Sequence, residues 1–192
     1  MKPKILFILH LPPPIHGAAM MGKYIQESEL VNSSFDCFCI NLATAGSLSD
    51  IGHISLKKLL KYFFLLKHIS HVVREIRPEL VYITPNAGGK AFFKDFIVVQ
   101  MLKSMGCKVI AHYHNKGVSV YQSKWVYNFF YKRFFSNLKV ILLAENLYKD
   151  IAKYVKREDV YICPNGIPSS CKEEMEARRN NVIPHLLFLS NL

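Results

Sequence analysis

The feature that most constrains the fold is an alternation of short apolar runs with helical segments. Residues 4–10 read KILFILH, a continuous apolar run of the kind found in strands that are buried on both faces. Similar runs recur along the chain, and segments with helical periodicity separate them. We expect strands at residues 4–10, 35–41, 79–84, 107–113, 139–143 and 159–163, and helices at residues 17–29, 55–77, 90–105, 122–135 and 145–155. This order predicts βαβ units, and so an α/β, Rossmann-like three-layer domain with a parallel sheet.

The pattern changes after residue 163. Residues 164–168 read PNGIP, residues 169–184 are charged and weakly periodic, and residues 185–189 form a new apolar run. We therefore expect one domain over residues 1–163 and a linker over residues 164–184. Residues 185–192 then form the first strand of a second domain that this chain does not contain. The alternative is that this last strand docks back on the first sheet.

Composition narrows the class of protein. The chain has 192 residues, 51% of them hydrophobic, which is enough for one compact core. A formal net charge of +11 suggests a polyanionic partner: nucleic acid, an anionic membrane or a phosphorylated ligand. No apolar run is long enough to span a bilayer, and no secretory signal is recognised.

The cysteines indicate neither a metal site nor a disulfide framework. They are Cys37, Cys39, Cys107, Cys163 and Cys171. No C-x-x-C pair occurs, so the spacing gives no support for zinc. The four that lie in strand-like runs are expected to be buried, reduced thiols in a cytosolic protein.

Candidate ligand contacts lie in the loops that follow strands, because parallel sheets bind ligands at the carboxyl ends of their strands. His16 and Gly17 begin a helix after the first strand, where free N–H groups and the helix dipole suit a phosphate. Asn86, Gly88 and Gly89 precede another helix and permit close approach to the backbone. The dinucleotide fingerprint and the Walker A loop are both absent. Ordinary βα turns remain the alternative for these loops.

Residues 112–117 (HYHNKG) place a polar cluster after the fourth strand. Alternation puts His112 and His114 on the same side of that strand. A metal pair lacks a carboxylate or cysteine partner at suitable spacing, so no metal is expected. We expect His114 to hydrogen-bond a substrate hydroxyl with Asn115 beside it, and His112 to be a core histidine.

Together these segments resemble the first half of retaining GT-B glycosyltransferases of family 4. The resemblance rests on the proline-rich loop at residues 12–17, the strand 108–115 that ends in a cleft histidine, and the Pro-Asn-Gly segment at residues 162–167. Residues 185–192 resemble the first strand of the family's second domain. His16 departs from the pattern, because many members have glycine there.

The resemblance implies transfer of a sugar from a nucleotide-sugar donor, with retention of configuration and without a cofactor or metal. It implies that His114 lies near the transferred sugar and that Pro164, Asn165 and Gly166 lead into an interdomain hinge. The family's donor-binding half, with its E-x7-E motif, is absent from this sequence. The chain alone is therefore expected to be inactive.

Two helices suggest a membrane contact. On a helical wheel of residues 55–77, Phe64 lies among basic residues that include Lys57 and Lys61, a pattern typical of interfacial helices on anionic membranes. Residues 125–135 carry more rings than one core face needs. Such a contact would suit a lipid-linked or saccharide acceptor in surface-polysaccharide synthesis, at the inner face of the plasma membrane. The alternative is two ordinary core helices with solvated lysines.

A second functional class remains open from the sequence. The basic charge also fits a stand-alone Rossmann-like module that binds a phosphorylated ligand or nucleic acid. No nucleic-acid motif is present and the basic residues are spread along the chain, so nucleic acid is not the expected partner. A dinucleotide-dependent enzyme is excluded by the missing glycine fingerprint.

Overall fold

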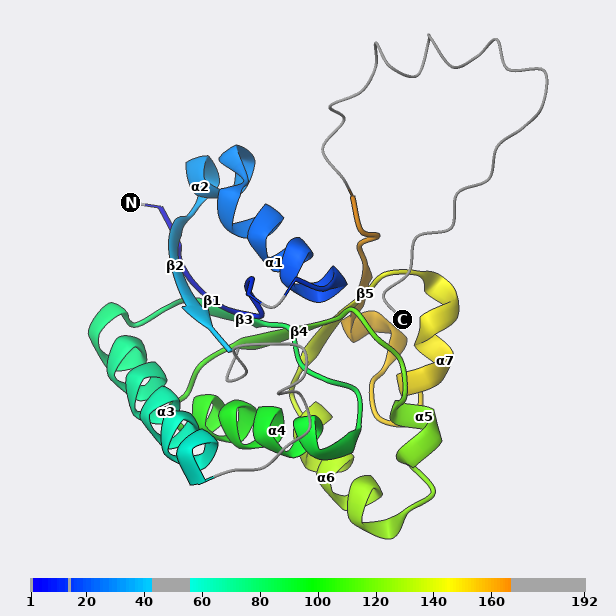
Figure 1. The fold of residues 1–192 in the computed structure, drawn as a ribbon. Helices are drawn as coiled ribbons and strands as arrows, with labels where there is room; N and C mark the ends of the chain where they lie inside the picture. Colours follow the sequence, from blue (N-terminus) through cyan, green and yellow to red (C-terminus); the bar gives the residue numbers. More distant parts are fainter. Residues whose placement is uncertain (1, 14, 43–55, 167–192) are drawn as a thin grey trace, which may run out of the picture.

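The computed structural model describes residues 2–13, 15–42 and 56–166. Its centre is a sheet of six strands in the order β2-β1-β3-β4-β5-β6 (Figure 1). The strands are β1 (Lys4–Leu9), β2 (Asp36–Asn41), β3 (Leu80–Ile83), β4 (Val109–Tyr113), β5 (Lys139–Leu142) and β6 (Val160–Ile162). All neighbouring pairs are parallel. The expected α/β, Rossmann-like class is therefore confirmed.

Helices lie on both faces of this sheet. They are α1 (Gly17–Glu27), α2 (Glu29–Ser34), α3 (Leu56–Ile76), α4 (Gly89–Ser104), α5 (Val118–Tyr121), α6 (Trp125–Phe135) and α7 (Tyr148–Ile151), with 3-10 turns at Glu145–Leu147 and Arg157–Asp159. Figure 1 shows α1 and α2 on one side of the sheet, and α3, α4 and α6 on the other. Within the described ranges, no helix combines the length and the apolarity that crossing a bilayer requires.

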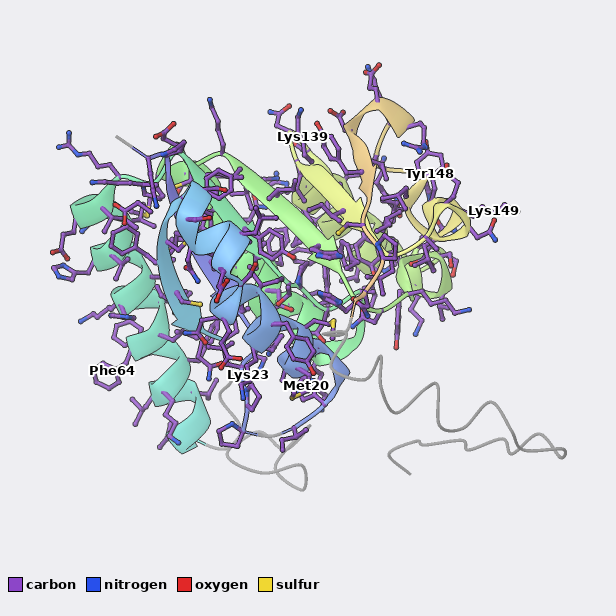
Figure 2. The ribbon with its side chains drawn as sticks, turned by 90° about the horizontal axis from the view of Figure 1, so that it is seen from above. Met20, Lys23, Phe64, Lys139, Tyr148 and Lys149 are labelled. Carbon is purple, nitrogen blue, oxygen red and sulfur yellow. The ribbon has the colours of Figure 1, made fainter. Side chains whose placement is uncertain are left out.

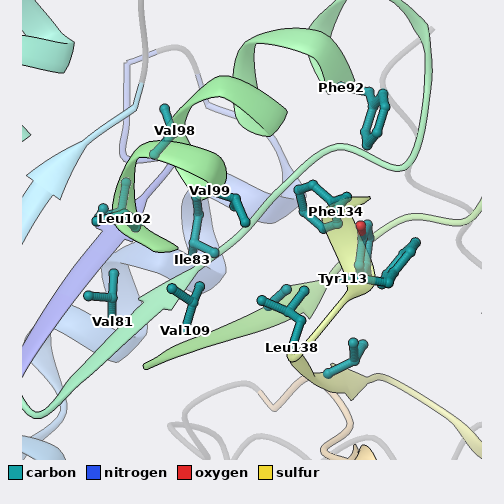
Figure 3. Packing of buried hydrophobic residues seen from close by; sticks show 14 of the residues in the cluster. Val81, Ile83, Phe92, Val98, Val99, Leu102, Val109, Tyr113, Phe134 and Leu138 are labelled. Carbon is teal, nitrogen blue, oxygen red and sulfur yellow. The ribbon is translucent and has the colours of Figure 1, made fainter. Parts of the chain in front are cut away.

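The larger core lies between the sheet and the layer of α3, α4 and α6. Alternate residues of the central strands point into it, as the period of two in a strand requires. Figure 3 shows side chains of β3 and β4 packed against those of α4 and α6. Its labelled members are Val81, Ile83, Phe92, Val98, Val99, Leu102, Val109, Tyr113, Phe134 and Leu138. The intervening residues of β1 face α1 and α2 in a second, smaller cluster.

Four helical segments differ from the prediction. The helix expected over residues 122–135 begins only at Trp125, because Lys124 is extended. The helix expected over residues 17–29 ends at Glu27, because Ser28 is extended and its hydroxyl accepts from the Val31 N–H to begin α2. The short helix α5 was not predicted. The segment expected to be helical over residues 145–155 contains only one α-helical turn, α7. A 3-10 turn precedes it, and after it the Tyr154 N–H donates to the Ile151 carbonyl at 2.8 Å.

The expected burial of the cysteines is wrong. Cys39 and Cys163 are exposed, and Cys37 and Cys107 are only half-buried. Cys39 lies on β2 and Cys163 follows β6, the two edge strands of the sheet that the described residues form. The loop around residue 50, Cys171, most of the predicted linker and the strand predicted at residues 185–192 lie outside the described residues.

Candidate functional site at the carboxyl edge of the sheet

Strand order determines which loops meet at the carboxyl edge of the sheet. The chain leaves β1 toward β2 on one side and later returns to β3 on the other side of β1. In open α/β sheets, such a reversal of strand order opens a crevice where ligands bind. His10 directly follows β1, and His112 and His114 lie at the end of β4, one strand beyond β3.

Four histidines gather at this edge, which we call the histidine cluster: His10, His16, His112 and His114. The rings of His112 and His114 are 4.3 Å apart between centroids, and those of His10 and His16 are 6.1 Å apart. His10 also lies within electrostatic reach of His114 and of Lys94 on α4. The expected alternation of His112 and His114 on one side is confirmed, since Tyr113 between them belongs to the core.

His16 is held by the first turn of α1. It is the N-cap, and its Nδ1 accepts a hydrogen bond of 3.3 Å from the Ala19 N–H. Capping by a side chain satisfies one of the N–H groups that a helix leaves free at its start. Gly17 follows, exposed, with no heavy atom within 4 Å of where a Cβ would lie. Among the described residues, the space beside the Gly17 α-carbon is therefore open.

Four buried ring nitrogens of the histidine cluster have no hydrogen bond of ordinary geometry among the described residues. They are His10 Nε2, His112 Nε2 and both ring nitrogens of His114, and Thr84 Oγ1 after β3 belongs to the same set. His112 Nδ1 pairs with the Tyr82 hydroxyl, and His16 Nδ1 pairs with the Ala19 N–H. Buried polar atoms are nearly always satisfied in folded proteins, so a concentration of unsatisfied ones at one edge marks a functional site rather than a core.

Burial keeps three of these histidines, His10, His112 and His114, neutral at pH 7. It lowers the pKa of His10 to about 4, helped by the neighbouring His16, Lys94 and His114. Burial, with His114 nearby, lowers the pKa of His112 to about 4. The pKa of His114 is also lowered by burial, against a smaller opposite effect from the Asn165 side chain. A neutral imidazole offers one donor and one acceptor, which suits hydrogen bonds to hydroxyl groups.

The position of Asn165 was not foreseen. The sequence predicted Pro164, Asn165 and Gly166 only as a hinge, yet the Asn165 side chain lies close enough to His114 to affect its pKa. All three residues are exposed. The chain after β6 therefore returns to the histidine cluster, and Asn165 joins the candidate site residues.

A second feature of this edge is an open depression of about 240 Å³. Some of its lining residues directly follow His114 in the sequence. It lies between the loops that follow β3 and β4. Its lining residues are Asn86, Ala87, Gly88, Gly89, Asn115, Lys116, Gly117 and Tyr121. Four of the predicted binding residues are thus brought together: Asn86, Gly88, Gly89 and Asn115.

Two carboxylates, the buried Asp95 and the half-buried Asp150, shape this depression. Asp95 on α4 accepts from the backbone N–H and the side-chain amide of Asn86, both at 2.8 Å. Its burial raises its pKa to about 6. Asp150 on α7 accepts from the N–H groups of Gly117 and Val118 at 2.9 and 3.0 Å. It supplies the cap that begins α5, which explains why local sequence did not predict that helix.

Other contacts fix the two loops to each other. The Asn115 Oδ1 atom accepts from the Ala87 N–H at 3.0 Å, and the Tyr131 hydroxyl donates to the Ala87 carbonyl at 2.6 Å. A Cβ on Gly88 would lie 2.3 Å from the Tyr121 ring, so the backbone and that ring are in direct contact. Asn115 therefore positions the loops with its oxygen, while its exposed amide remains beside the depression.

Among the described residues, no group of three or more histidine, cysteine, aspartate or glutamate side chains is arranged to hold a metal ion. The histidine cluster supplies neutral nitrogens without a nearby carboxylate. Glu145, after β5, is held by Arg157 through two bonds of 2.8 and 2.7 Å. The arrangement is thus suited to hydrogen bonding of a polar, hydroxyl-rich ligand.

The buried state of His10 predicts a pH dependence of stability. Its pKa lies at about 4 in the folded chain and at 6.5 ordinarily, so the unfolded chain binds a proton first as the pH falls. Stability from neutral His10 is present above pH 6.5 and is lost toward pH 4, by roughly 3 kcal/mol. We expect His10→Gln to lose less unfolding free energy than the wild type between pH 7 and pH 4, measured by urea titration. Equal losses in the two proteins would contradict the burial of His10.

Comparison with protein-family models finds no match to this chain, and comparison with curated proteins also finds none.

Proposed function

We propose that this chain is the acceptor-side domain of a retaining glycosyltransferase that uses a nucleotide-sugar donor. The observation that carries the proposal lies in the histidine cluster: His10, His112 and His114 are neutral rings with unpaired nitrogens at the carboxyl edge of a parallel sheet. Sugars present many hydroxyl groups, and neutral imidazoles pair with them as donor and acceptor. The resemblance of residues 12–17, 108–115 and 162–167 to family 4 enzymes supports the same function.

In this proposal the histidines and the helix start have separate roles. His114 hydrogen-bonds the sugar that is transferred, and Asn165 lies beside it. The open start of α1 at His16 and Gly17 faces a phosphate or the acceptor, since free N–H groups at a helix start favour negative charge. The depression lined by Asn86 and Asn115 receives part of the acceptor.

The reaction balances without a cofactor. The bond between the sugar C1 and the diphosphate oxygen breaks, a bond from C1 to an acceptor oxygen forms, and the acceptor hydroxyl proton passes to the leaving diphosphate. The described residues contribute orientation of the sugar rather than neutralisation of the diphosphate. The proposal therefore requires a second, donor-binding domain that holds the nucleotide, and the acceptor is a saccharide or a lipid-linked saccharide.

The test is a transfer assay on the protein expressed from its whole reading frame. It is incubated with a panel of radiolabelled nucleotide sugars and a lipid extract, and release of nucleoside diphosphate and labelled product are both measured. We expect one donor to be consumed with label entering the acceptor. If no donor is consumed while the protein binds inorganic phosphate or a polyanion, the basic binding module becomes the better description.

A further inference from the structure

The outward face of α3 carries five exposed large apolar side chains in its first nine residues. Their exposed fractions are 75% for Leu56, 55% for Leu59, 52% for Leu60, 50% for Phe63 and 64% for Phe64. Figure 2 shows Phe64 directed away from the body of the molecule. We call these five residues the α3 apolar surface. The opposite side of the helix, with Ile69 and Val73 fully or almost fully buried, faces the core.

Cationic side chains accompany this surface. Lys61 and Lys67 are exposed, and the Lys67 ammonium lies 4.9 Å from the centre of the Phe63 ring. The helix contains Lys57, Lys58, Lys61, Lys67 and Arg74 against one acidic residue, Glu75, in its last turn. The side chains of Lys57 and Lys58 lie outside the described part of the structure. Beyond Phe64 the outward face becomes polar, so the apolar part is confined to the first half of the helix.

Another helix of the same layer, separated from α3 by α4, repeats this combination. On α6, Trp125 is 81% exposed and Phe129 is 49% exposed, and the Arg133 guanidinium lies 4.8 Å from the Phe129 ring. No acidic residue occurs in α6. Scattered single apolar residues are normal on surfaces, but a contiguous apolar strip bordered by cations is not.

We propose that the α3 apolar surface docks on the interface of an anionic lipid bilayer. The surface is convex and helical, and it combines leucine and phenylalanine with lysine, which is the composition of helices that lie in the membrane interface. The chain's net charge of +11 is complementary to anionic lipid. The inference does not depend on the enzymatic proposal, because it rests on exposure and charge alone.

The position of the surface has a consequence for the candidate site. A crossover helix between parallel strands runs antiparallel to them, so its first residues lie toward the carboxyl ends of the strands. The apolar residues occupy this first half of α3, on the same edge as the histidine cluster. Docking would therefore bring that edge near the bilayer. If the proposed function holds, a lipid-linked acceptor can reach the site without leaving the membrane.

The experiment is co-sedimentation of the chain with vesicles. One set contains phosphatidylcholine and phosphatidylglycerol in equal parts, and the other contains phosphatidylcholine alone. We expect binding to the anionic vesicles that weakens with added salt, and much weaker binding to the neutral ones. Leu60→Ser with Phe64→Ser should reduce the partition to anionic vesicles at least about tenfold, because two large apolar side chains no longer enter the interface.

A matched control separates docking through α3 from nonspecific adsorption of exposed apolar side chains to the vesicles. Leu30→Ser with Tyr161→Ser removes two exposed apolar side chains from outside α3, at 76% and 47% exposure, and should leave vesicle binding unchanged. Thermal melting establishes that both double variants are folded. Equal binding by wild type and the α3 variant would overturn the proposal. The proposal would also be overturned if the wild type did not bind anionic vesicles but formed dimers, and the α3 substitutions abolished those dimers. The α3 apolar surface would then bind a second copy of the chain. Transfer to a water-soluble acceptor reports on the proposed function separately.

Discussion

His114→Ala is expected to lower sugar transfer at least about 100-fold while leaving the free energy of unfolding unchanged or raised. The rate falls because a preorganised hydrogen-bonding group beside the reacting sugar is lost, and removal of one such group typically costs two to three orders of magnitude, or about 100- to 1,000-fold. Stability does not fall, because no hydrogen bond of ordinary geometry ties either ring nitrogen to a described residue, and the Asn165 side chain that influences the His114 pKa is exposed. The measurements are the transfer assay on the full-length protein and urea unfolding.

Two companion variants sharpen this prediction. His114→Gln keeps an N–H donor and should restore part of the rate. Lys149→Ala removes an exposed side chain that Figure 2 shows directed outward from α7, and it should change neither rate nor stability. A His114→Ala protein that loses several kcal/mol of stability would show that the ring is structural. A folded variant with near-normal turnover would remove His114 from the mechanism.

Gly22→Ala is expected to have the largest effect on stability. A Cβ at Gly22 would lie 2.3 Å from the His10 carbonyl oxygen, which is backbone and cannot rotate away. The helix α1 must then move off the end of β1, and overpacking of this kind costs about 1–3 kcal/mol and occasionally more. The shift should also displace the His10 and His16 rings, because His16 caps α1 and the backbone of His10 contacts α1 at Gly22.

Gly17→Ala in the same helix is the matched control. No heavy atom lies within 4 Å of the position of its Cβ. Alanine there reduces the freedom of the unfolded chain, so stability should be unchanged or rise by up to about 1 kcal/mol. Urea titration of both variants measures the difference. Equal stabilities of Gly22→Ala and Gly17→Ala would contradict the close approach of α1 to β1.

The strands and most helices could be predicted because their signals are local. A buried parallel strand is a short apolar run, and every strand of the sheet was predicted to within two residues at each end. The elements and burial states that the sequence did not predict have non-local causes. The helix α5 begins only because Asp150, 32 positions beyond Val118, accepts its first N–H groups. Cys39 looked buried because apolar residues surround it in sequence, but only strand order shows that β2 is an edge strand.

The candidate site was predictable in part for the same reason. The loops with His114, Asn86 and Asn115 follow apolar runs, so their location at the carboxyl edge could be inferred. The approach of His10 to His114 depends on the order β1-β3-β4, which no local window contains. His10 had one usable signal, its place at the end of the first strand.

The roles of two further side chains could not be predicted from the sequence. Asp95 lies within an amphipathic helix, where an acidic residue normally faces solvent, yet it is 4% exposed and holds the Asn86 loop. Asn165 looked like part of a turn, and its proximity to His114 arises because the chain leaves β6 toward the cluster. Side chains that act across the fold leave no pattern in neighbouring residues.

The measurement that tests the account most directly is a nitrogen NMR spectrum of histidine-labelled, full-length protein during titration with nucleotide sugars. Substitution of single histidines assigns the ring signals. The account predicts that one donor shifts the signals of His114 and His10, while those of the exposed His68 and His71 on α3 stay in place. If a donor is consumed in the transfer assay and the ring signals of the histidine cluster do not move, the sugar binds elsewhere and the assignment of this edge as the site is wrong.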